Sequence, residues 1–194
     1  MGYFRKPRLA QTEQFMSRRR FLSLGAIAAT ISLCPGFSLA HSRRAGAPEK
    51  SLAIYNTHTG EKLQRVYWFR GKYLSDSLRD INRILRDHHS DEIHPIDPQL
   101  LDLLYALSQK VNATEPLHVF SGYRSPVTNA MLRQHNPAVA AHSLHIEGKA
   151  VDIKFPGRHL NLVRRAAVSL QSGGVGYYPG SNFIHVDTGP VRFW

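Results

Sequence analysis

Cysteine is almost missing from this chain of 194 residues. The one cysteine, Cys34, lies in an N-terminal segment that precedes every histidine. The rest of the chain can therefore form neither a disulfide framework nor a thiolate metal site, because both need several cysteines. Any metal ion bound there must be held by histidine and carboxylate side chains. All eleven histidines lie after residue 40.

The chain also lacks a long unbroken hydrophobic run. Its most apolar N-terminal stretch, residues 22–39, is interrupted by Gly25, Pro35 and Gly36. The uninterrupted part is shorter than the roughly 20 apolar residues that span a bilayer as a helix. A retained membrane anchor is therefore the less favoured alternative to a cleaved targeting segment.

Two motifs around this stretch favour export. Ser17-Arg18-Arg19-Arg20-Phe21-Leu22 has the form of a twin-arginine signal, and Ser38-Leu39-Ala40 is a small-x-small cleavage site. We predict that residues 1–40 are a signal peptide and that the mature protein is periplasmic, with no stable membrane span after cleavage.

Acidic residues are scarce relative to basic ones: 14 against 25, for a net charge of +11. Residues 1–40 hold six basic residues and one acidic, so the remainder has 19 basic against 13 acidic residues and a net charge of +6. This charge suits a polyanionic partner, such as nucleic acid, a membrane surface or a cell-wall polymer, or else is an ordinary solvated surface. No nucleic-acid recognition motif and no stretch of interleaved aromatic and basic residues is present, which disfavours nucleic acid.

Hydrophobic periodicity divides the remainder into a flexible leader, 41–50, and one domain, 51–194. Asp97-Pro98 and Ser125-Pro126 each pair a capping residue with a proline suited to a first helical turn. The expected strands are 51–55, 61–69, 117–121, 150–155, 175–178 and 183–187; the expected helices are 77–87, 98–111, 126–134 and 160–170. These elements predict an α+β domain with helices packed on a mainly antiparallel sheet.

Two imidazoles and a carboxylate form the most informative pattern. Asp152 and His185 each lie on the polar side of an expected strand whose alternate residues are apolar. If those strands pair, the two side chains can converge, and Gly148 can let the backbone bring His145 over the same face. Three such ligands with an open fourth position are typical of catalytic zinc sites.

Other interpretations of these residues remain open at this point. A single histidine beside a strand is more often a surface residue than a metal ligand, and a single strand aspartate is usually solvated. His185-x-Asp187 also resembles the start of a non-haem iron triad, but no histidine follows Asp187 to complete it.

The domain resembles the YcbK-like murein endopeptidases of the M15 zinc peptidase clan, which share a fold with D-Ala-D-Ala carboxypeptidases and the hedgehog signalling domain. The resemblance covers nearly all of the chain after the signal. It rests on motifs in a common order: Asn56-Thr-His-Thr-Gly-Glu61, Ile96-Asp97-Pro98, Ser121-Gly-Tyr-Arg-Ser125, Ser143-Leu-His145 to Asp152, Gly173-Gly-Val-Gly-Tyr-Tyr-Pro179 and Ser181 to Pro190.

This resemblance implies that His145, Asp152 and His185 bind Zn²⁺ and that Arg124 belongs to the active site. It further implies that the substrate is peptidoglycan, cleaved at the D-Ala–diaminopimelate cross-link between stem peptides. The alternatives are a D-Ala-D-Ala carboxypeptidase, or a zinc-containing module that binds peptidoglycan without cutting it.

The general base is not specified by the motif. Many relatives in the clan place Glu or His shortly before the last zinc histidine, but Asn182 and Phe183 occupy those positions here. Asp187 is our candidate, because it lies on the same strand face as His185, about 6.6 Å further along. Asp187 could equally orient a metal-binding histidine. His142 is a lesser candidate for the base.

Overall fold

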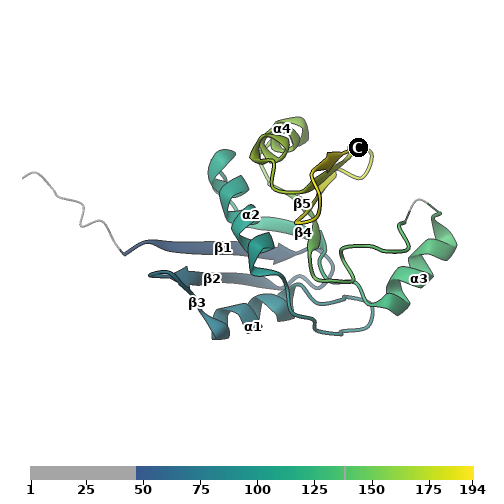
Figure 1. Ribbon diagram of the computed structural model, residues 1–194, viewed down its shortest axis with the longest axis horizontal. Helices are drawn as coiled ribbons and strands as arrows, with labels where there is room; N and C mark the ends of the chain where they lie inside the picture. The colour runs from purple at the N-terminus through teal and green to yellow at the C-terminus, as the bar shows by residue number, and fades with distance from the viewer. Residues whose placement is uncertain (1–46, 138) are drawn as a thin grey trace, which may run out of the picture. The chain divides into compact units, whose positions relative to one another are not determined.

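The computed structural model describes residues 47–137 and 139–194; the predicted signal peptide and most of the predicted leader lie outside these residues. Four helices and eight strands form the described part (Figure 1). In chain order they are β1 (Glu49–Asn56), β2 (Lys62–Phe69), β3 (Lys72–Tyr73), α1 (Ser75–Ile84), α2 (Pro98–Lys110), β4 (Leu117–Ser121), α3 (Pro126–His135), β5 (Ala150–Lys154), α4 (Leu160–Leu170), β6 (Gly174–Tyr178), β7 (Phe183–Asp187) and β8 (Arg192–Phe193).

All the strands belong to one sheet, in the order β3-β2-β1-β4-β5-β7-β6-β8. Five of its seven neighbouring pairs are antiparallel, and β1–β4 and β6–β8 are parallel. The predicted fold class, α+β with helices on a mainly antiparallel sheet, is therefore confirmed. No helix within the described ranges is long and apolar enough to span a bilayer.

One face of the sheet packs against α1, α2 and α4, whereas α3 lies apart from α2 and α4 (Figure 1). The leucine stripe of α2 supplies much of this core, as its helical spacing predicts. Apolar residues at alternate positions along the strands complete this core. Fully or almost fully buried members include Ile54, Ile81, Leu100, Leu104, Leu107, Val119, Ile153, Ile184 and Val186.

Both proline-initiated helices begin where the sequence predicts. The Asp97 carboxylate accepts a hydrogen bond from the Gln99 N–H at 2.9 Å, and the Ser125 hydroxyl accepts one from the Thr128 N–H at 3.1 Å. These caps satisfy backbone donors that the first helical turn leaves unpaired.

Several boundaries differ from those expected, most of them by one or two residues. β1 begins at Glu49, inside the predicted leader, because Glu49 and Lys50 pair with the end of β2. α1 ends at Ile84 rather than residue 87, because the buried Asp87 carboxylate instead accepts backbone hydrogen bonds from His89 and Ser125 in the following loop. The short edge strands β3 and β8 were not predicted, since two-residue strands carry no periodicity.

Candidate metal centre

The paired strands β5 and β7 place two of the predicted ligands directly opposite each other. Asp152 and His185 are register partners. Their neighbours Ile153 and Ile184 point into the helix-covered core and are fully buried. A slip of one residue in either strand would exchange these faces, so burial of the isoleucines fixes the polar pair on the other side.

His145 reaches the same point from the turn that precedes β5. Its Nδ1 donates to the Gly122 carbonyl at 2.7 Å, so Nε2 is left as an acceptor. That Nε2 lies 3.2 Å from His185 Nδ1 and 3.4 Å from Asp152 Oδ1. Gly148 permits this approach: its φ is +66°, and a Cβ there would lie 2.3 Å from the Pro95 carbonyl oxygen.

The three side chains converge as acceptors. One ligand atom from each of His145, Asp152 and His185 lies within 4.8 Å of the others, and all three residues are buried. Burial alone would raise the pKa of Asp152, but the adjacent imidazoles hold it well below its usual range. Two imidazole nitrogens and a carboxylate oxygen are ligand atoms that zinc takes, so this donor set fits a divalent metal such as Zn²⁺.

Asp187 lies two residues after His185 on β7 and contacts the His185 ring. Its carboxylate is fully buried; Oδ2 accepts from His185 Nε2 at 3.0 Å, and Oδ1 accepts from the Gly174 and Gly189 N–H groups at 2.9 and 2.8 Å. Arg192 donates to both oxygens. Burial alone would raise the pKa of Asp187, but these donors hold it well below its usual range. Asp187 thus directs His185 Nδ1 toward the centre, which favours the orienting role over the general base.

The double glycine after α4 makes this contact possible. A Cβ at Gly173 would lie 1.8 Å from the Asp187 carbonyl oxygen, and one at Gly174 would lie 2.4 Å from Asp187 Oδ2. The helix itself ends in a left-handed Gln171, with φ of 50°. The two glycines therefore allow the backbone to pack closely against Asp187, in addition to following the end of the helix.

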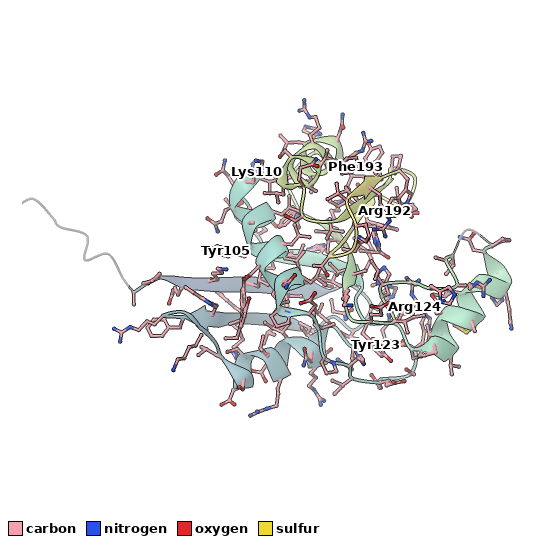
Figure 2. The ribbon with its side chains drawn as sticks, viewed as in Figure 1. Tyr105, Lys110, Tyr123, Arg124, Arg192 and Phe193 are labelled. Atoms are coloured by element: carbon pink, nitrogen blue, oxygen red, sulfur yellow. The ribbon has the colours of Figure 1, made fainter. Side chains whose placement is uncertain are left out.

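Arg124, labelled in Figure 2, approaches Asp152 from the segment between β4 and α3. Its Nη2 is 3.7 Å from Asp152 Oδ2 and donates to the Ser121 hydroxyl at 3.2 Å. Burial lowers the pKa of Arg124, which the charges of Asp152 and Asp87 partly offset. The guanidinium remains a cation at physiological pH, because arginine side chains do not lose their proton in proteins.

A cavity of about 460 Å³ opens over these groups. Arg124, the three convergent residues, His142 and Ser143 all line it. Tyr178 lines the cavity too, whereas Tyr177 packs against the hydrophobic core. A cavity of this size, with a buried cation and a cluster of acceptors at its base, is typical of small-substrate sites.

Comparison with known proteins agrees with this geometry. The family model described as Peptidoglycan L,D-endopeptidase MepK, of the peptidase M15 group, matches residues 44–194. The chain belongs to this family.

Curated relatives match over most of their length. Peptidoglycan L,D-endopeptidase MepK of Escherichia coli strain K12 is 39% identical over 180 residues, covering 92% of this chain and 97% of the relative. The probable peptidoglycan L,D-endopeptidase MepK of Haemophilus influenzae is 40% identical over 180 residues, covering 92% and 95%. Among solved structures, the L-Ala D-Glu endopeptidase ChiX of Serratia marcescens aligns with 49% of this chain and 68% of its own, at 14% identity and a TM-score of 0.34. That alignment carries no functional conclusion.

The resemblance to M15 murein endopeptidases that the motifs indicated is thus confirmed. The sequence did not point to two C-terminal residues of the site. Arg192 holds Asp187, and the Trp194 ring lies 5.4 Å from the His185 ring while its Nε1 donates to the Tyr178 hydroxyl. Arg192 and Trp194 lie in a short segment without a motif or periodicity, so the sequence pattern alone does not indicate a role for them.

Proposed function

We propose that this protein is an exported, zinc-dependent endopeptidase that hydrolyses the peptide cross-links of peptidoglycan. The observation that carries the proposal is the convergence of His145, Asp152 and His185 within 4.8 Å at the base of a cavity. Membership of the MepK family and the curated relatives' names support peptidoglycan as the substrate. The N-terminal motifs support export.

His145, Asp152 and His185 would hold the zinc ion through Nε2, a carboxylate oxygen and Nδ1 respectively. When bound in such a site, zinc supplies a polarising positive charge and a water-derived nucleophile at neutral pH. The Gly122 carbonyl and Asp187 each fix one imidazole by accepting its other N–H. Such contacts hold the ring orientation and increase the basicity of the liganding nitrogen.

Arg124 stabilises the negative charge that develops on the scissile carbonyl oxygen, or holds a substrate carboxylate beside it. Its guanidinium offers several donors in a planar fork, and it faces the cavity next to Asp152. The loop that carries it is anchored by Asp87, which accepts from the Ser125 N–H at 2.8 Å. Arg124 therefore meets the substrate from a fixed position.

His142 is the better placed of the two candidate proton acceptors. Asp187 is fully buried and already accepts from His185, Arg192 and two backbone N–H groups. His142 lines the cavity. We expect His142→Gln to lower kcat while bound zinc stays at the wild-type level, and Asp187→Asn to weaken zinc binding instead. An Asp187→Asn protein that keeps full zinc but loses activity would restore Asp187 as the base.

Two types of peptidoglycan cross-link are candidates for the bond that is cleaved. The resemblance of the motifs implied the D-Ala–diaminopimelate bond, which joins two D centres. The curated relatives are named L,D-endopeptidases, and this favours a bond from an L-configured acyl residue to a D-configured amine. We propose the L,D cross-link as the preferred substrate and the D,D cross-link as the alternative.

The deciding experiment uses two soluble muropeptide dimers, one joined by an L,D bond between diaminopimelate residues and one by D-Ala–diaminopimelate. The purified protein, with its zinc content measured, is incubated with each dimer and the products are read by mass. We expect monomers from the L,D dimer, lost on chelation or in His185→Ala and restored to the chelated wild type by zinc.

Other outcomes favour other functions. Release of a terminal D-Ala without monomers would indicate a carboxypeptidase. Intact dimers in the presence of stoichiometric zinc would indicate a peptidoglycan-binding module without catalysis.

A further inference from the structure

A row of basic and aromatic side chains crosses the face of the sheet opposite the helices. We call it the cross-strand row. It runs over six adjacent strands from β2 to β6, and its members are Lys62, Tyr55, His118, Lys154, Phe183 and Tyr178. The pairing Tyr55↔Lys62, Tyr55↔His118, His118↔Lys154 and Tyr178↔Phe183 joins them. Phe183 stands beside Lys154, since the preceding pair is Ile153↔Ile184.

Contacts along the row are direct. The Lys62 ammonium lies 5.7 Å from the centre of the Tyr55 ring, and the Tyr55 and His118 rings meet edge-on at 4.8 Å. At the other end, Phe183 stacks on Tyr178 at 4.8 Å. The rings are thus ordered by one another rather than by burial beneath a helix.

The row is accessible to solvent, unlike the opposite face. Lys62 and Tyr178 are exposed, and the other four members are partly exposed. In the same strands, the helix-facing Ile54, Val119, Ile153 and Ile184 are at most 1% exposed. The row therefore lies on an open face of the sheet, where no described helix covers it.

Its charge is positive and not neutralised within the row. No member is acidic, and neither Lys62 nor Lys154 forms an ion pair with any residue in 47–137 or 139–194. Burial first, and then the charges of Lys154 and Lys62, lower the pKa of His118, whereas Glu115 raises it. The two ammonium groups therefore act on the same stretch of surface.

The row is continuous with the candidate metal centre. Phe183 and Tyr178 line the cavity, and Lys154 lies two residues along β5 from Asp152, on the same face. From Lys154 on β5 to Lys62 on β2 the row crosses three steps between adjacent strands, each of about 4.8 Å, which is about 14 Å. An extended peptide of about four residues, at ~3.4 Å each, has this length. A peptide cleaved at the metal centre can thus continue over the row.

We propose that the cross-strand row binds the carboxylate-bearing stem peptide of peptidoglycan on one side of the bond that is cleaved. Lys62 and Lys154 contact its carboxylates, and the aromatic rings pack against its aliphatic parts. The inference rests on the proposed function for the identity of the substrate. It gives the solvent-exposed row, which lies outside the metal centre, a role in substrate affinity.

The test replaces both lysines, in Lys62→Gln/Lys154→Gln. The matched control, Lys72→Gln/Lys110→Gln, removes the same charge from β3 and from the end of α2, where Figure 2 labels Lys110. Exposed ion pairs are worth about 0.2–1 kcal/mol each, so we expect a rise in KM of about two- to thirty-fold for the cleaved dimer, with kcat unchanged. The control variant should keep the wild-type KM.

Two further measurements separate this inference from the proposed function. Raising the salt concentration should increase KM for the wild type more than for the row variant, because fewer charged contacts remain to be screened. Binding of the intact dimer to His185→Ala protein, with and without the row substitutions, is measured by calorimetry whether or not cleavage occurs. Equal dissociation constants for the two proteins would overturn the role of the row, whereas failure of the wild type to cut any dimer would overturn only the proposed function.

Discussion

The two faces of the sheet are built by the same strands and differ in almost every physical property. On β5, Val151 and Ile153 face the helices and are fully buried, whereas Asp152 and Lys154 face away from them. The apolar face contributes most of the burial that stabilises the fold, and the polar face carries the candidate chemistry. The alternation of a strand thus lets a few residues serve stability and function without competing for the same side chains.

The polar face is itself divided. Near β7 it is closed over by the C-terminal segment and the turn with His145, so that His145, Asp152, His185 and Asp187 are buried. Toward β1 and β2 it is open. Charged groups that are buried together interact strongly because water does not screen them. Charged groups on the open part interact weakly, because water and salt screen them. Four predictions test this contrast.

The largest effect should come from breaking the convergent centre. His145→Ala removes one of the three metal-binding atoms, and we expect bound zinc to fall to trace levels and cleavage of the muropeptide dimer to drop by about 10³-fold or more, because the metal supplies several kcal/mol of transition-state stabilisation. Metal analysis and a cleavage assay measure both. His135→Ala, on α3, is the control; zinc retained at full occupancy by His145→Ala would contradict the ligand assignment.

A substitution on the apolar, helix-covered face of the sheet should lower stability instead. Ile153 is fully buried, one residue from Asp152. Ile153→Ala should lower the free energy of unfolding by about 2–5 kcal/mol, because it loses apolar burial and leaves a cavity. Urea unfolding measures the change, and Val127→Ala, at a position 79% exposed, should change it by less than about 0.5 kcal/mol. A similar loss in both variants would refute the contrast between the faces.

Removing the support beneath the centre should have an intermediate effect. Arg192→Gln deprives Asp187 of its ionic partner, and Asp187 then orients His185 less firmly. Zinc affinity should fall about ten-fold, as is usual for groups that orient a metal ligand. Competition with a chelator gives the dissociation constant. Arg133→Gln, an exposed site on α3, should leave it unchanged, and an unchanged constant in Arg192→Gln would exclude the orienting role.

The smallest effect concerns pH and the loop that carries Arg124. Burial alone would raise the pKa of Asp87, but hydrogen bonds from Thr128, Ser125 and His89 hold it well below its usual range. Its stabilising contribution is present above the unfolded-state pKa of about 3.9 and is lost as the pH falls below it, because the unfolded state then binds more protons.

We therefore expect the free energy of unfolding to fall between about pH 5 and pH 3, and to fall less steeply in Asp87→Asn. Urea unfolding across this range measures both slopes. Asp76→Asn, on α1, is the control, with the wild-type slope. A slope in Asp87→Asn equal to that of the wild type would show that Asp87 does not contribute.

Much of the fold could be predicted from the residues alone. The stripe of α2 and the caps at Asp97 and Ser125 specify their helices locally, and the helices began where expected. Boundaries set by long-range contacts were missed: α1 ends early because Asp87 bonds to Ser125, 38 residues further along the chain. The role of Asp187 was left between two alternatives for the same reason, because its donors come from Gly174, Gly189 and Arg192.

The sequence by itself determined which residue types could hold a metal and which strand face each would occupy, because alternation is a local property of the backbone. Tertiary structure alone decided that Asp187, held by Arg192, orients His185, and that basic and aromatic residues scattered along the chain align in the cross-strand row. The sequence predicted the meeting of His145 with Asp152 and His185 only on the condition that the two strands pair. Strand pairing and sheet order create these contacts. These contacts depend on which segments lie side by side, and the residue pattern within one segment does not specify which other segments will pair with it.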